Sequence, residues 1–298
     1  MDFKQIEAFI NVAKYRSFSK AAEAIYLSQP TVSAHISSLE NELNVNLFDR
    51  SGKEVKLTYA GSVFLEYAIN LINIRNSAIT TLADLDNKIS GKLVIASSTT
   101  PCRFLLPSIL SSFHNDYSNV TFDIKEESTR NVIDLILSGN ADIGIVGEII
   151  HDNKLSYVKI GDDKLVLISN NKELPENIAF DRLLKEKFIL RDKGSATRNV
   201  FEKSLELHGI SLNKLNIFAE VSSLEAVLQL VKYNVGVSIV SELACQDYIK
   251  AGLIRKHNVI NFNITRGIYL VAHNKRTLSP STKAFYQHVV SKLINNNS

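Results

Sequence analysis

One stretch of the chain, residues 17–50, predicts two short helices joined by a tight turn. Ser28 is placed to cap the second helix, and Pro30 falls in its first turn, where a missing N–H costs nothing. The apolar positions that follow recur at spacings of four, three and four, which makes one buried helical stripe. They are Val32, Ile36, Leu39 and Leu43.

The opposite face of this second helix carries small, hydrogen-bonding side chains. They are Pro30, Thr31, Ser33, Ala34, Ser37, Ser38 and Asn41. A helix anchored on one face and polar on the other suits the DNA major groove, so the sequence predicts a helix-turn-helix that binds DNA. Gln29, Thr31 and Ser33 are the expected base readers, and Pro30 and Ala34 offer apolar contacts to thymine methyls.

The same stretch resembles the LysR-type transcriptional regulators of bacteria over about the first sixty residues. The matching positions are Phe9, Val12, Ser17-Phe18-Ser19, Ala21-Ala22, Leu27-Ser28-Gln29-Pro30, Val32-Ser33, Leu39-Glu40, Leu43, Leu47-Phe48, Arg50, Leu57-Thr58 and Gly61. The family often carries Arg or Lys where this chain has Ala34, Ser37 and Ser38. That departure predicts fewer phosphate contacts per subunit and a need for several subunits on the DNA.

Basic and acidic residues balance within residues 1–60, so phosphate contacts must come from local clusters. The expected cluster is Arg50, Lys53 and Lys56, in a polar segment that predicts a β-hairpin wing over 49–57 with Gly52 at its turn.

Composition narrows the class of protein further. No apolar run approaches the ~20 residues of a membrane span, and the first residues lack the apolar core of a signal peptide. Cys102 and Cys245 form neither a disulfide framework nor a zinc-binding pattern. We therefore expect a cytoplasmic protein with no metal or other cofactor and no membrane partner.

A long helix is predicted from about residue 59 to 90, capped by Thr58 and ended by Gly91. Apolar residues follow a heptad seam along it, which favours a dimerisation helix. The seam is Phe64, Ala68, Leu71, Arg75, Ala78, Leu82, Leu85 and Ile89, with Arg75 as its one interruption. A surface helix packed on its own domain is the alternative.

From Lys92 the pattern becomes alternating strands and helices, which predicts an α/β fold with parallel strands. The strands are expected at 93–96, 120–125, 143–146, 165–168, 188–190, 217–221, 237–239 and 267–272, and the helices at 104–113, 132–137, 200–208, 224–233 and 280–294. The resemblance implies a periplasmic-binding-protein-like pair of lobes with a cleft between them. The expected domains are 1–58 (winged helix-turn-helix), 59–90 (linker helix) and 91–298 (effector binding), with lobe I at 91–161 and 266–298 and lobe II at 162–265.

Three strand-to-helix junctions predict an effector site in that cleft. Thr100 before Pro101 and Ser195 are placed to cap helices, and Ser222 with Glu225 reads as a capping box. Free N–H groups at such ends attract anions, although each hydroxyl alone would merely cap its helix. The positions that match the family's effector site are Ser98, Thr99, Thr100, Ser195 and Thr197, and Ser222 and Arg130 are added as candidates.

Hydroxyls and helix N-termini favour a small, compact anion as the effector. Arg130, Arg191 and Arg198 are the candidates to neutralise it, with surface ion pairs as the alternative. The segment 191–198, with Ser98-Thr99-Thr100, resembles the family branch that governs sulfur and related inorganic-anion metabolism. Sulfate, sulfite, thiosulfate or a small carboxylate would suit these donors.

The predicted function is a DNA-binding transcriptional regulator controlled by a small, anionic effector between two lobes. Its partners would be double-stranded operator DNA, the effector and further copies of the chain, as a homodimer or a dimer of dimers, with RNA polymerase left open. An enzyme is not expected, because the S-x-x-K pattern from Ser17 to Lys20 has no partner motif. The alternative is a cytoplasmic solute-binding protein, or a redox sensor in which a helix dipole lowers the pKa of Cys102.

Overall fold

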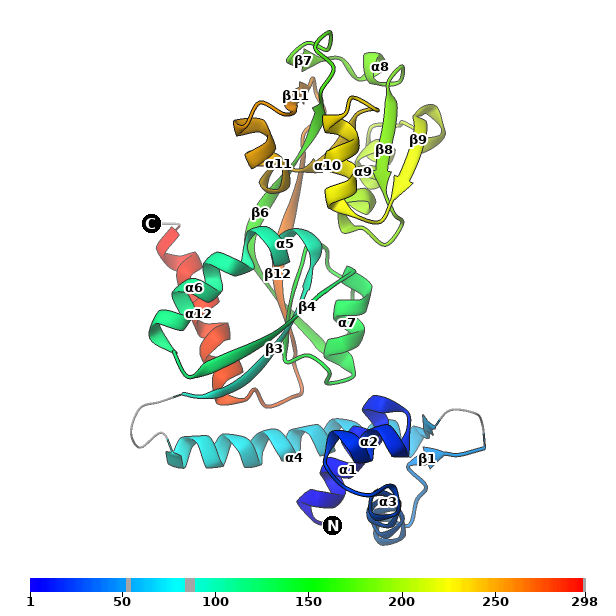
Figure 1. The fold of residues 1–298 in the computed structure, drawn as a ribbon, viewed down its shortest axis with the longest axis vertical. Helices are drawn as coiled ribbons and strands as arrows, with labels where there is room; N and C mark the ends of the chain where they lie inside the picture. The colour runs from blue at the N-terminus through cyan, green and yellow to red at the C-terminus, as the bar shows by residue number, and fades with distance from the viewer. Residues whose placement is uncertain (52–54, 84–88, 297–298) are drawn as a thin grey trace.

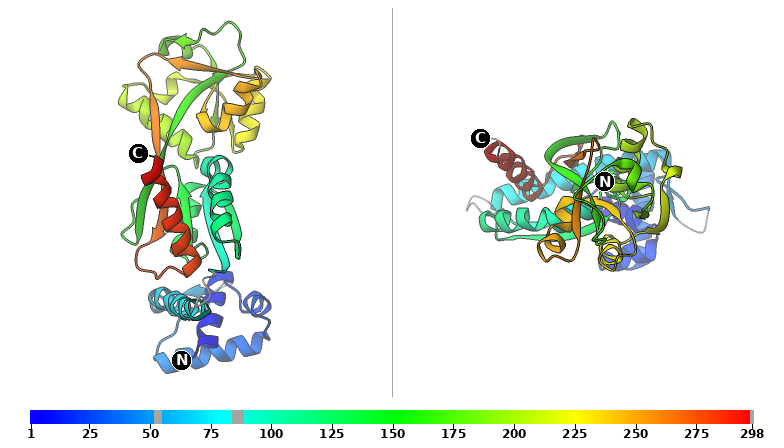
Figure 2. Two further views of the ribbon diagram at one scale, coloured as in Figure 1. Left: turned by 90° about the vertical axis from the view of Figure 1, so that its left-hand side faces the viewer. Right: turned by 90° about the horizontal axis from the view of Figure 1, so that it is seen from above.

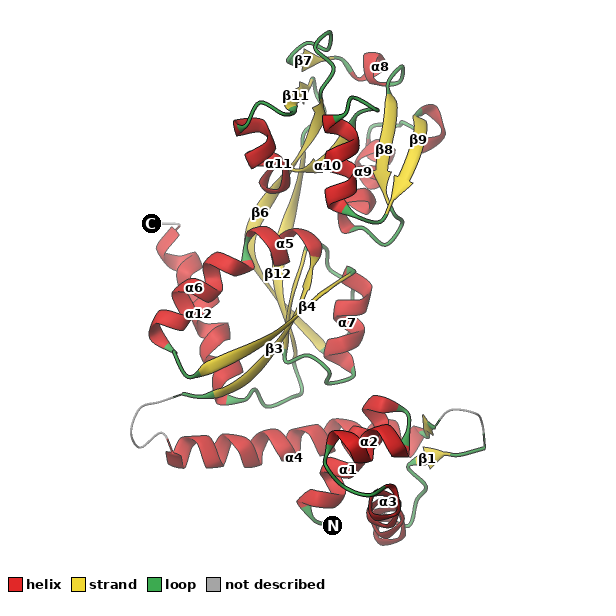
Figure 3. Ribbon diagram, in the orientation of Figure 1, coloured by secondary structure: helices red, strands yellow, loops and turns green. Residues whose placement is uncertain are grey.

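The computed structural model describes residues 1–51, 55–83 and 89–296 and arranges them in three tiers (Figure 1). The N-terminal helices and the long helix α4 form one end. One α/β lobe, lobe I, lies in the middle, and a second, lobe II, forms the other end, as the side view in Figure 2 also shows. The separation into a mostly helical end and two mixed lobes (Figure 3) confirms the predicted fold class.

The N-terminal tier is a helix-turn-helix with a small wing. The helices are α1 Phe3–Tyr15, α2 Phe18–Ala24 and α3 Gln29–Leu43, and the antiparallel wing strands are β1 Phe48–Asp49 and β2 Lys56–Leu57. The predicted stripe on α3 is confirmed, because Val32, Ile36 and Leu39 are fully buried. They pack with Phe9 and Ala21 in one core, where the small side chain of Ala21 allows α2 to approach closely. The predicted wing turn at Gly52 lies outside the described residues.

Helix α4, Tyr59–Ala83, follows the wing and begins at the predicted cap, since Thr58 accepts a hydrogen bond from the N–H of Gly61 at 2.9 Å. Gly61 also allows α4 to touch the wing, because a Cβ there would lie 2.0 Å from the carbonyl oxygen of Leu47. The described helix ends at Ala83, and Ile89 packs in the core of lobe I instead of continuing the helix. The predicted extent to residue 90 is therefore wrong at Ile89, while Leu85 lies outside the described residues.

The first half of the predicted seam on α4 packs inside its own chain. Ala68 is fully buried and Phe64 and Leu71 are partly buried against the helix-turn-helix core, while Arg75 pairs with Glu7 of α1 at 2.7 Å. The alternative of a helix packed on its own domain is thus correct for this face. A different face of α4 leaves large apolar side chains exposed. They are Val63, Tyr67 and Ile74, at spacings of four and seven.

Lobe I is built on a sheet of order β4-β3-β5-β12-β6, in which β3, β4 and β5 are parallel. Its strands are β3 Gly91–Ser98, β4 Val120–Glu127 and β5 Ile143–Val146, and its helices are α5 Thr99–Phe104, α6 Leu106–Asp116, α7 Thr129–Leu137 and α12 Pro280–Asn296. The single helix predicted at 104–113 is wrong at its start, because α5 and α6 divide at Leu105.

Two long antiparallel strands, β6 Leu155–Ser169 and β12 Ile264–His273, run through both lobes (Figure 1). The sequence pattern predicted only the last part of β6, at 165–168. Its first part mixes exposed polar residues such as Ser156, Lys159 and Lys164 with buried and half-buried ones, so it lacks a continuous apolar run. These strands are the two covalent connections between the lobes.

Lobe II extends the sheet beyond this crossing, and its elements surround a core that includes Phe188 and Phe201. The strands are β7 Asn177–Ile178, β8 Lys187–Arg191, β9 Asn216–Val221, β10 Ser238–Ser241 and β11 Arg255–Val259. The helices are α8 Phe180–Leu183, α9 Ala196–Leu207, α10 Leu224–Lys232 and α11 Glu242–Lys250, with a 3-10 turn η2 at Leu212–Lys214. Strands β8 and β9 are parallel as predicted, whereas β10 and β11 pair antiparallel with β6.

The described part of the chain contains no helix long and apolar enough to cross a membrane. Within those same residues, no group of three or more His, Cys, Asp or Glu side chains is arranged to hold a metal ion.

Candidate DNA-binding surface and effector cleft

Helix α3 lies at the end of the molecule farthest from lobe II and presents its N-terminal half outward (Figure 1). Gln29, Pro30 and Thr31 are exposed, as are Ala34 and Ser38 further along. Ser33 and Ser37 are half-buried at the edges of this surface. The predicted base-reading residues therefore lie on one helix surface, on which Gln29 and Thr31 are exposed and Ser33 is half-buried.

Hydrogen bonds hold part of this surface in place. The hydroxyl oxygens of Thr31 and Ser28 lie 2.8 Å apart, and Ser28 caps α3 by accepting from the N–H of Thr31 at 3.3 Å. Ser38 accepts a hydrogen bond from the side-chain amide of Gln5 on α1 at 3.1 Å. The Gln29 side chain and the apolar Pro30 and Ala34 add no constraint of this kind to the surface.

The wing is tied to α3 through Glu40. One carboxylate oxygen of Glu40 accepts the N–H groups of Leu47 and Phe48 at 2.8 and 3.2 Å, and the other pairs with Arg50 at 2.7 Å. The guanidinium of Arg50 also lies 5.2 Å above the Phe18 ring. Arg50 thus fixes the base of the wing, and Lys53, its predicted companion, lies outside the described residues.

A cavity of about 230 Å³ lies between the two lobes. Lobe I contributes the ends of β3 and β4 with the starts of α5 and α7, and lobe II contributes the segment before α9 and the end of β9. The lining residues are Ser98, Thr99, Thr100, Glu126, Glu127, Ser128, Thr129, Arg191, Asp192, Gly194, Ser195, Ala196, Thr197, Ser222 and Arg266. We call this cavity the effector cleft.

The predicted effector residues meet in this cleft, with the exception of Arg130. Ser98, Thr99, Thr100, Ser195, Thr197 and Ser222 all line it. Arg130 is exposed and is not among the lining residues. It follows Thr129 in the first turn of α7, and successive helical residues point about 100° apart, so the helix directs it away.

The three predicted caps differ in outcome. Ser195 caps α9 as predicted, accepting from the N–H of Arg198. Thr100 does not cap: α5 starts at Thr99, is six residues long, and its Ser98 makes no side-chain cap bond. The cap of α10 is Ser223, not Ser222, so the predicted capping box is wrong.

Glu225 consequently stands one position too early for a capping box. Its carboxylate accepts hydrogen bonds from the Tyr248 hydroxyl at 2.6 Å and from Gln229 at 2.9 Å. These bonds lower the pKa of Glu225. It is a structural acceptor between α10 and α11.

The Cys102 thiol is not activated. Burial, followed by the nearby Glu126 carboxylate, raises its pKa, so the dipole-lowered pKa considered from the sequence is wrong. Burial also raises the pKa of Cys245 to about 12. Both thiols therefore stay protonated at neutral pH, which argues against the redox-sensor alternative.

Arg191 and Thr129 give the strongest indication that the cleft binds a ligand. The sequence pattern indicates Arg191 only as one of three candidate arginines and does not identify Thr129. The Nε of Arg191 and the Oγ1 of Thr129 are buried without a hydrogen-bond partner. The Arg191 side chain is only 12% exposed, and its contact with Asp192 is at 3.5 Å. Burial lowers the pKa of Arg191, and the neighbouring Asp192 carboxylate offsets only part of this effect.

The other candidate arginine is fully engaged. Arg198 pairs with Glu202 at 2.6 Å and Glu220 at 2.9 Å, and it donates to the carbonyl of Arg191. It holds the segment before α9 in place and is not free for a ligand.

A buried polar network lies where β6 and β12 pass from one lobe to the other. Arg266 of β12 donates to Asp163 of β6 at 2.8 and 2.9 Å and to the hydroxyl of Thr100 at 3.2 Å. Asp163 also accepts from Ser241 at 2.6 Å. The network joins both lobes to the rear of the effector cleft, since Arg266 and Thr100 line it.

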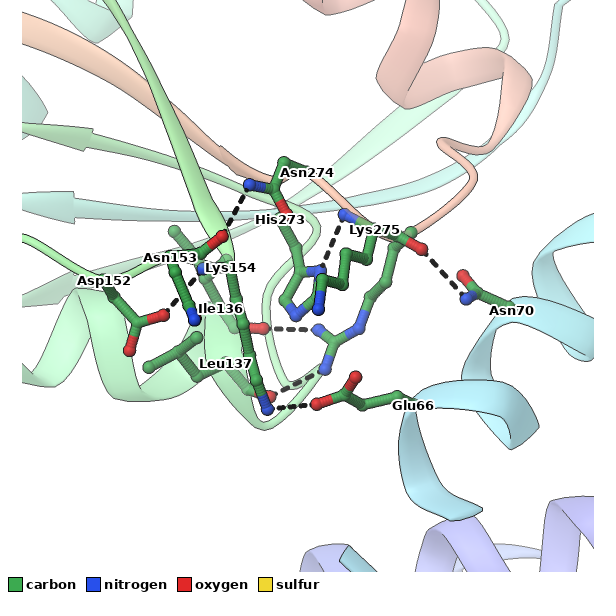
Figure 4. Close-up of polar contacts among 11 residues, drawn as sticks. Glu66, Asn70, Ile136, Leu137, Asp152, Asn153, Lys154, His273, Asn274 and Lys275 are labelled. Atoms are coloured by element: carbon green, nitrogen blue, oxygen red, sulfur yellow. Dashed lines mark hydrogen bonds and ion pairs between the residues drawn. The ribbon is translucent and has the colours of Figure 1, made fainter. Parts of the chain in front are cut away.

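A second polar junction connects lobe I to α4 (Figure 4). The amide of Asn70 donates to the carbonyl of Lys275 at 3.0 Å, and Asn73 donates to that of Thr277 at 3.0 Å. Glu66 of α4 pairs with Lys154, the residue that precedes β6. The effector lobes are therefore attached to the linker helix by specific contacts.

Comparison with known families divides the chain into an N-terminal and a C-terminal part, as the structure does. A family model for the bacterial regulatory helix-turn-helix protein of the LysR family matches residues 3–62, and one for the LysR substrate binding domain matches residues 86–293. An HTH-type transcriptional regulator of Methanocaldococcus jannaschii is 35% identical over 286 residues, covering 95% of this chain and 96% of its own. A probable RuBisCO transcriptional regulator of Cyanidioschyzon merolae is 30% identical, covering 96% and 97%.

Solved structures share the fold at lower identity. A full-length OxyR variant from Pseudomonas aeruginosa has a TM-score of 0.77 at 19% identity, covering 97% of this chain and 94% of its own. Full-length CbnR in complex with its target DNA has a TM-score of 0.61 at 22% identity, covering 98% and 99%. The effector-binding domain of QuiR in complex with shikimate has a TM-score of 0.63 at 17% identity, covering 70% and 99%.

Proposed function

Because this chain belongs to the LysR family, and is therefore a DNA-binding transcriptional regulator with an effector-binding domain, we propose that α3 reads its operator. The proposed contact residues are Gln29, Pro30, Thr31, Ser33, Ala34, Ser37 and Ser38, with Arg50 and Lys53 at the adjacent backbone. The exposed N-terminal half of α3 above its buried stripe supports this proposal. The family consists of regulators, and we propose no catalytic activity.

Substitution of Gln29 tests the reading surface. Gln29→Ala should relax sequence preference by about 1–3 kcal/mol, because it removes a side chain that can form two hydrogen bonds with a base edge. Asn115→Ala, which deletes an exposed amide on α6 of lobe I, is the matched control. Binding-site selection from a random duplex library, followed by titration, measures both. Equal sequence preference in Gln29→Ala and the parent would show that Gln29 does not read bases.

We propose that the effector cleft binds a small anion through Arg191, Thr129 and the N-terminus of α9. The observation that carries this is the buried Nε of Arg191, which has no hydrogen-bond partner although the guanidinium lies 3.5 Å from Asp192. The N–H groups of the first turn of the twelve-residue α9 add a favourable dipole beside Ser195 and Thr197. Ser98, Thr99, Thr100 and Ser222 complete the proposed site.

The charge of the cleft favours a monoanion. Glu126, Glu127 and Asp192 also line it, although Arg103 neutralises Glu126. A doubly charged anion would meet more repulsion there than a small carboxylate, so we favour a carboxylate over sulfate or thiosulfate. The names of the relatives described above refer to RuBisCO or to no pathway, and they lend no support to the sulfur branch.

Binding would change the closure of the two lobes about β6 and β12. The buried Arg266–Asp163 pair at the crossing supports domain boundaries near 161/162 and 265/266, with 1–58 and 59–90 as the remaining units. A change in closure would rearrange the subunits on DNA. We propose that this happens in the cytoplasm, and contact with RNA polymerase stays open.

Calorimetry and thermal denaturation test the cleft. Acetate, lactate, N-acetylserine, sulfate and thiosulfate form a suitable panel, because a ligand that prefers the folded state must raise the melting temperature. We expect at least one carboxylate to bind and Arg191→Met to weaken its binding about 100-fold. If no compound releases or takes up heat on mixing or raises the melting temperature, the anion site is refuted. If Arg191→Met binds the same compound as tightly as the parent, the anion binds away from Arg191.

We propose that two chains pair through the exposed apolar face of α4, which differs from the heptad seam predicted first. Tyr67→Asp with Ile74→Asp should halve the mass of the assembly and weaken operator binding through lost bivalency. Sedimentation measures the mass. Leu71→Asp is the contrasting variant, since Leu71 packs on the helix-turn-helix core and its loss should destabilise that domain. An unchanged mass in the double variant would assign assembly to the lobes alone.

A further inference from the structure

Helix α7 connects the effector cleft to the linker helix. Its cap Ser128 and first residue Thr129 line the cleft, and Ser128 accepts a hydrogen bond from the N–H of Asn131 at 3.2 Å. Nine residues later the carbonyls of Ile136 and Leu137 face α4 (Figure 4). At 1.5 Å per residue the helix spans about 14 Å, which is the distance that a signal must cross inside lobe I.

Arg276 holds the far end of α7. Its two terminal nitrogens donate to the carbonyls of Ile136 and Leu137, the latter at 2.7 Å. Carbonyls at a helix C-terminus carry partial negative charge, so this is a favourable position for a guanidinium. The segment that follows α7 touches α4 directly, because a Cβ at Gly139 would lie 2.4 Å from the Cδ1 of Ile69.

The segment that carries Arg276 is itself docked on α4. Asn70 donates to the carbonyl of Lys275 and accepts from the N–H of Thr277 at 3.1 Å, and Asn73 donates to the carbonyl of Thr277. Residues on both sides of Arg276 are therefore fixed to the linker helix. Helix α4 in turn packs against the helix-turn-helix core through Ala68.

We propose that α7 and Arg276 transmit occupancy of the effector cleft to α4, with Asn70 and Asn73 as the positioning residues that couple the two. This rests on the proposed function of the cleft. A ligand bound to Thr129 displaces the first turn of α7. The hydrogen-bonded helix moves as a unit, Arg276 follows its carbonyls, and the two asparagines carry the displacement to α4 and its DNA-binding domain.

The same contacts could fix lobe I to α4 without transmitting any displacement from the cleft. A substitution in the cleft, made without ligand, distinguishes fixed attachment from transmission. Thr129→Asp places a carboxylate in the cleft that Arg191 also lines, where the Nε of Arg191 has no hydrogen-bond partner, in imitation of a bound anion. Hydrogen exchange of the full chain then reports on residues 65–75 of α4. We expect exchange there to change about threefold or more, and we expect Ser128→Ala, which loosens the same turn without adding charge, to change it as well.

The decisive comparison repeats both perturbations in two backgrounds. In Asn70→Ala with Asn73→Ala the response of α4 should disappear, while the response of α7 itself persists. In Asn115→Ala, which deletes an exposed amide on α6, the response of α4 should be intact. An α4 that ignores both cleft variants, or that responds equally without Asn70 and Asn73, would overturn the proposal. Neither result depends on the anion-binding measurements that test the cleft.

Discussion

The two ends of helix α7 are both polar, but they differ in how their polar groups are satisfied. At the cleft end, Arg191 approaches Asp192 only to 3.5 Å, and the hydroxyl of Thr129 has no partner. At the linker end, Arg276 makes two hydrogen bonds to carbonyls, although its Nε and the Nε2 of His273 are unpaired. A buried donor without an acceptor costs stability, so the cleft end is arranged for a missing partner, whereas the linker end is arranged to hold two units together.

Replacing Arg191 should produce the largest effect and tests the cleft side of this comparison. Arg191→Met removes the buried charge, so affinity for a carboxylate that binds the parent should fall about 100-fold, from the loss of charge-assisted hydrogen bonds. The melting temperature of the ligand-free protein should change little, because removal of the unpartnered Nε offsets the loss of the 3.5 Å contact with Asp192. A lower melting temperature would mean that Arg191 is a structural residue like Arg276.

The pH dependence of stability tests the linker side. Burial, together with the charge of Arg276, lowers the pKa of His273 to about 4. The unfolded chain takes up this proton near pH 6.5, so between pH 6.5 and 4 the unfolded state holds more protons and stability falls as the pH falls. At pH 5 the loss from this one group is about 2 kcal/mol.

His273→Gln should remove that contribution. Urea denaturation of the parent and the variant at pH 7.5 and pH 5 measures the difference, and the variant should lose about 2 kcal/mol less than the parent on acidification. His257→Gln is a useful comparison, because its ring bonds to Ser169 and to the carbonyl of Pro175 within lobe II. Identical losses in the parent and in His273→Gln would show that His273 titrates normally.

A smaller effect is expected for Thr129→Val, which keeps the shape of the side chain and deletes its unpartnered hydroxyl. Affinity for the same carboxylate should fall about tenfold, with no loss of stability in the ligand-free protein, since no hydrogen bond is broken. Calorimetry and thermal denaturation give the two numbers. Thr282→Val, which alters a buried hydroxyl of α12 within 2.8 Å of Ser279, should show the opposite pattern of lost stability and unchanged affinity.

The sequence predicted the features that depend on local pattern. The stripe of Val32, Ile36 and Leu39 requires only helical periodicity, and the cleft follows from the rule that strand ends in a parallel sheet meet at one edge. Features decided by distant packing were not predictable. The burial of Arg191 depends on the surrounding lobe, and the packing of Phe64 and Leu71 depends on α1.

Helix α4 shows why distant packing could not be predicted from the sequence. Two apolar faces coexist on this helix, one through Phe64 and Leu71 and one through Val63 and Tyr67, and both satisfy helical spacing. The heptad pattern predicts the dimerisation face of α4 from the regularity of its apolar spacing. In the folded chain, the helix-turn-helix covers one apolar face, and the other stays exposed. Similarly, Thr100 was predicted as a cap from its position before Pro101, and it became a partner of Arg266, a residue 166 positions away.

The smallest expected effect concerns Gly139, where α7 ends against α4. Its φ of +74° is disfavoured for residues with a side chain, and an added Cβ would meet the Cδ1 of Ile69. Because that atom is the end of a flexible side chain, Ile69 can rotate away, and Gly139→Ala should cost only about 1 kcal/mol, mostly from the backbone. Denaturation of Gly139→Ala with and without Ile69→Val separates the two contributions. Because α7 is proposed to couple the cleft to α4, Gly139→Ala should also change affinity at the cleft slightly, as thermodynamic reciprocity requires of coupled sites, and an unchanged affinity would place this contact outside the coupling.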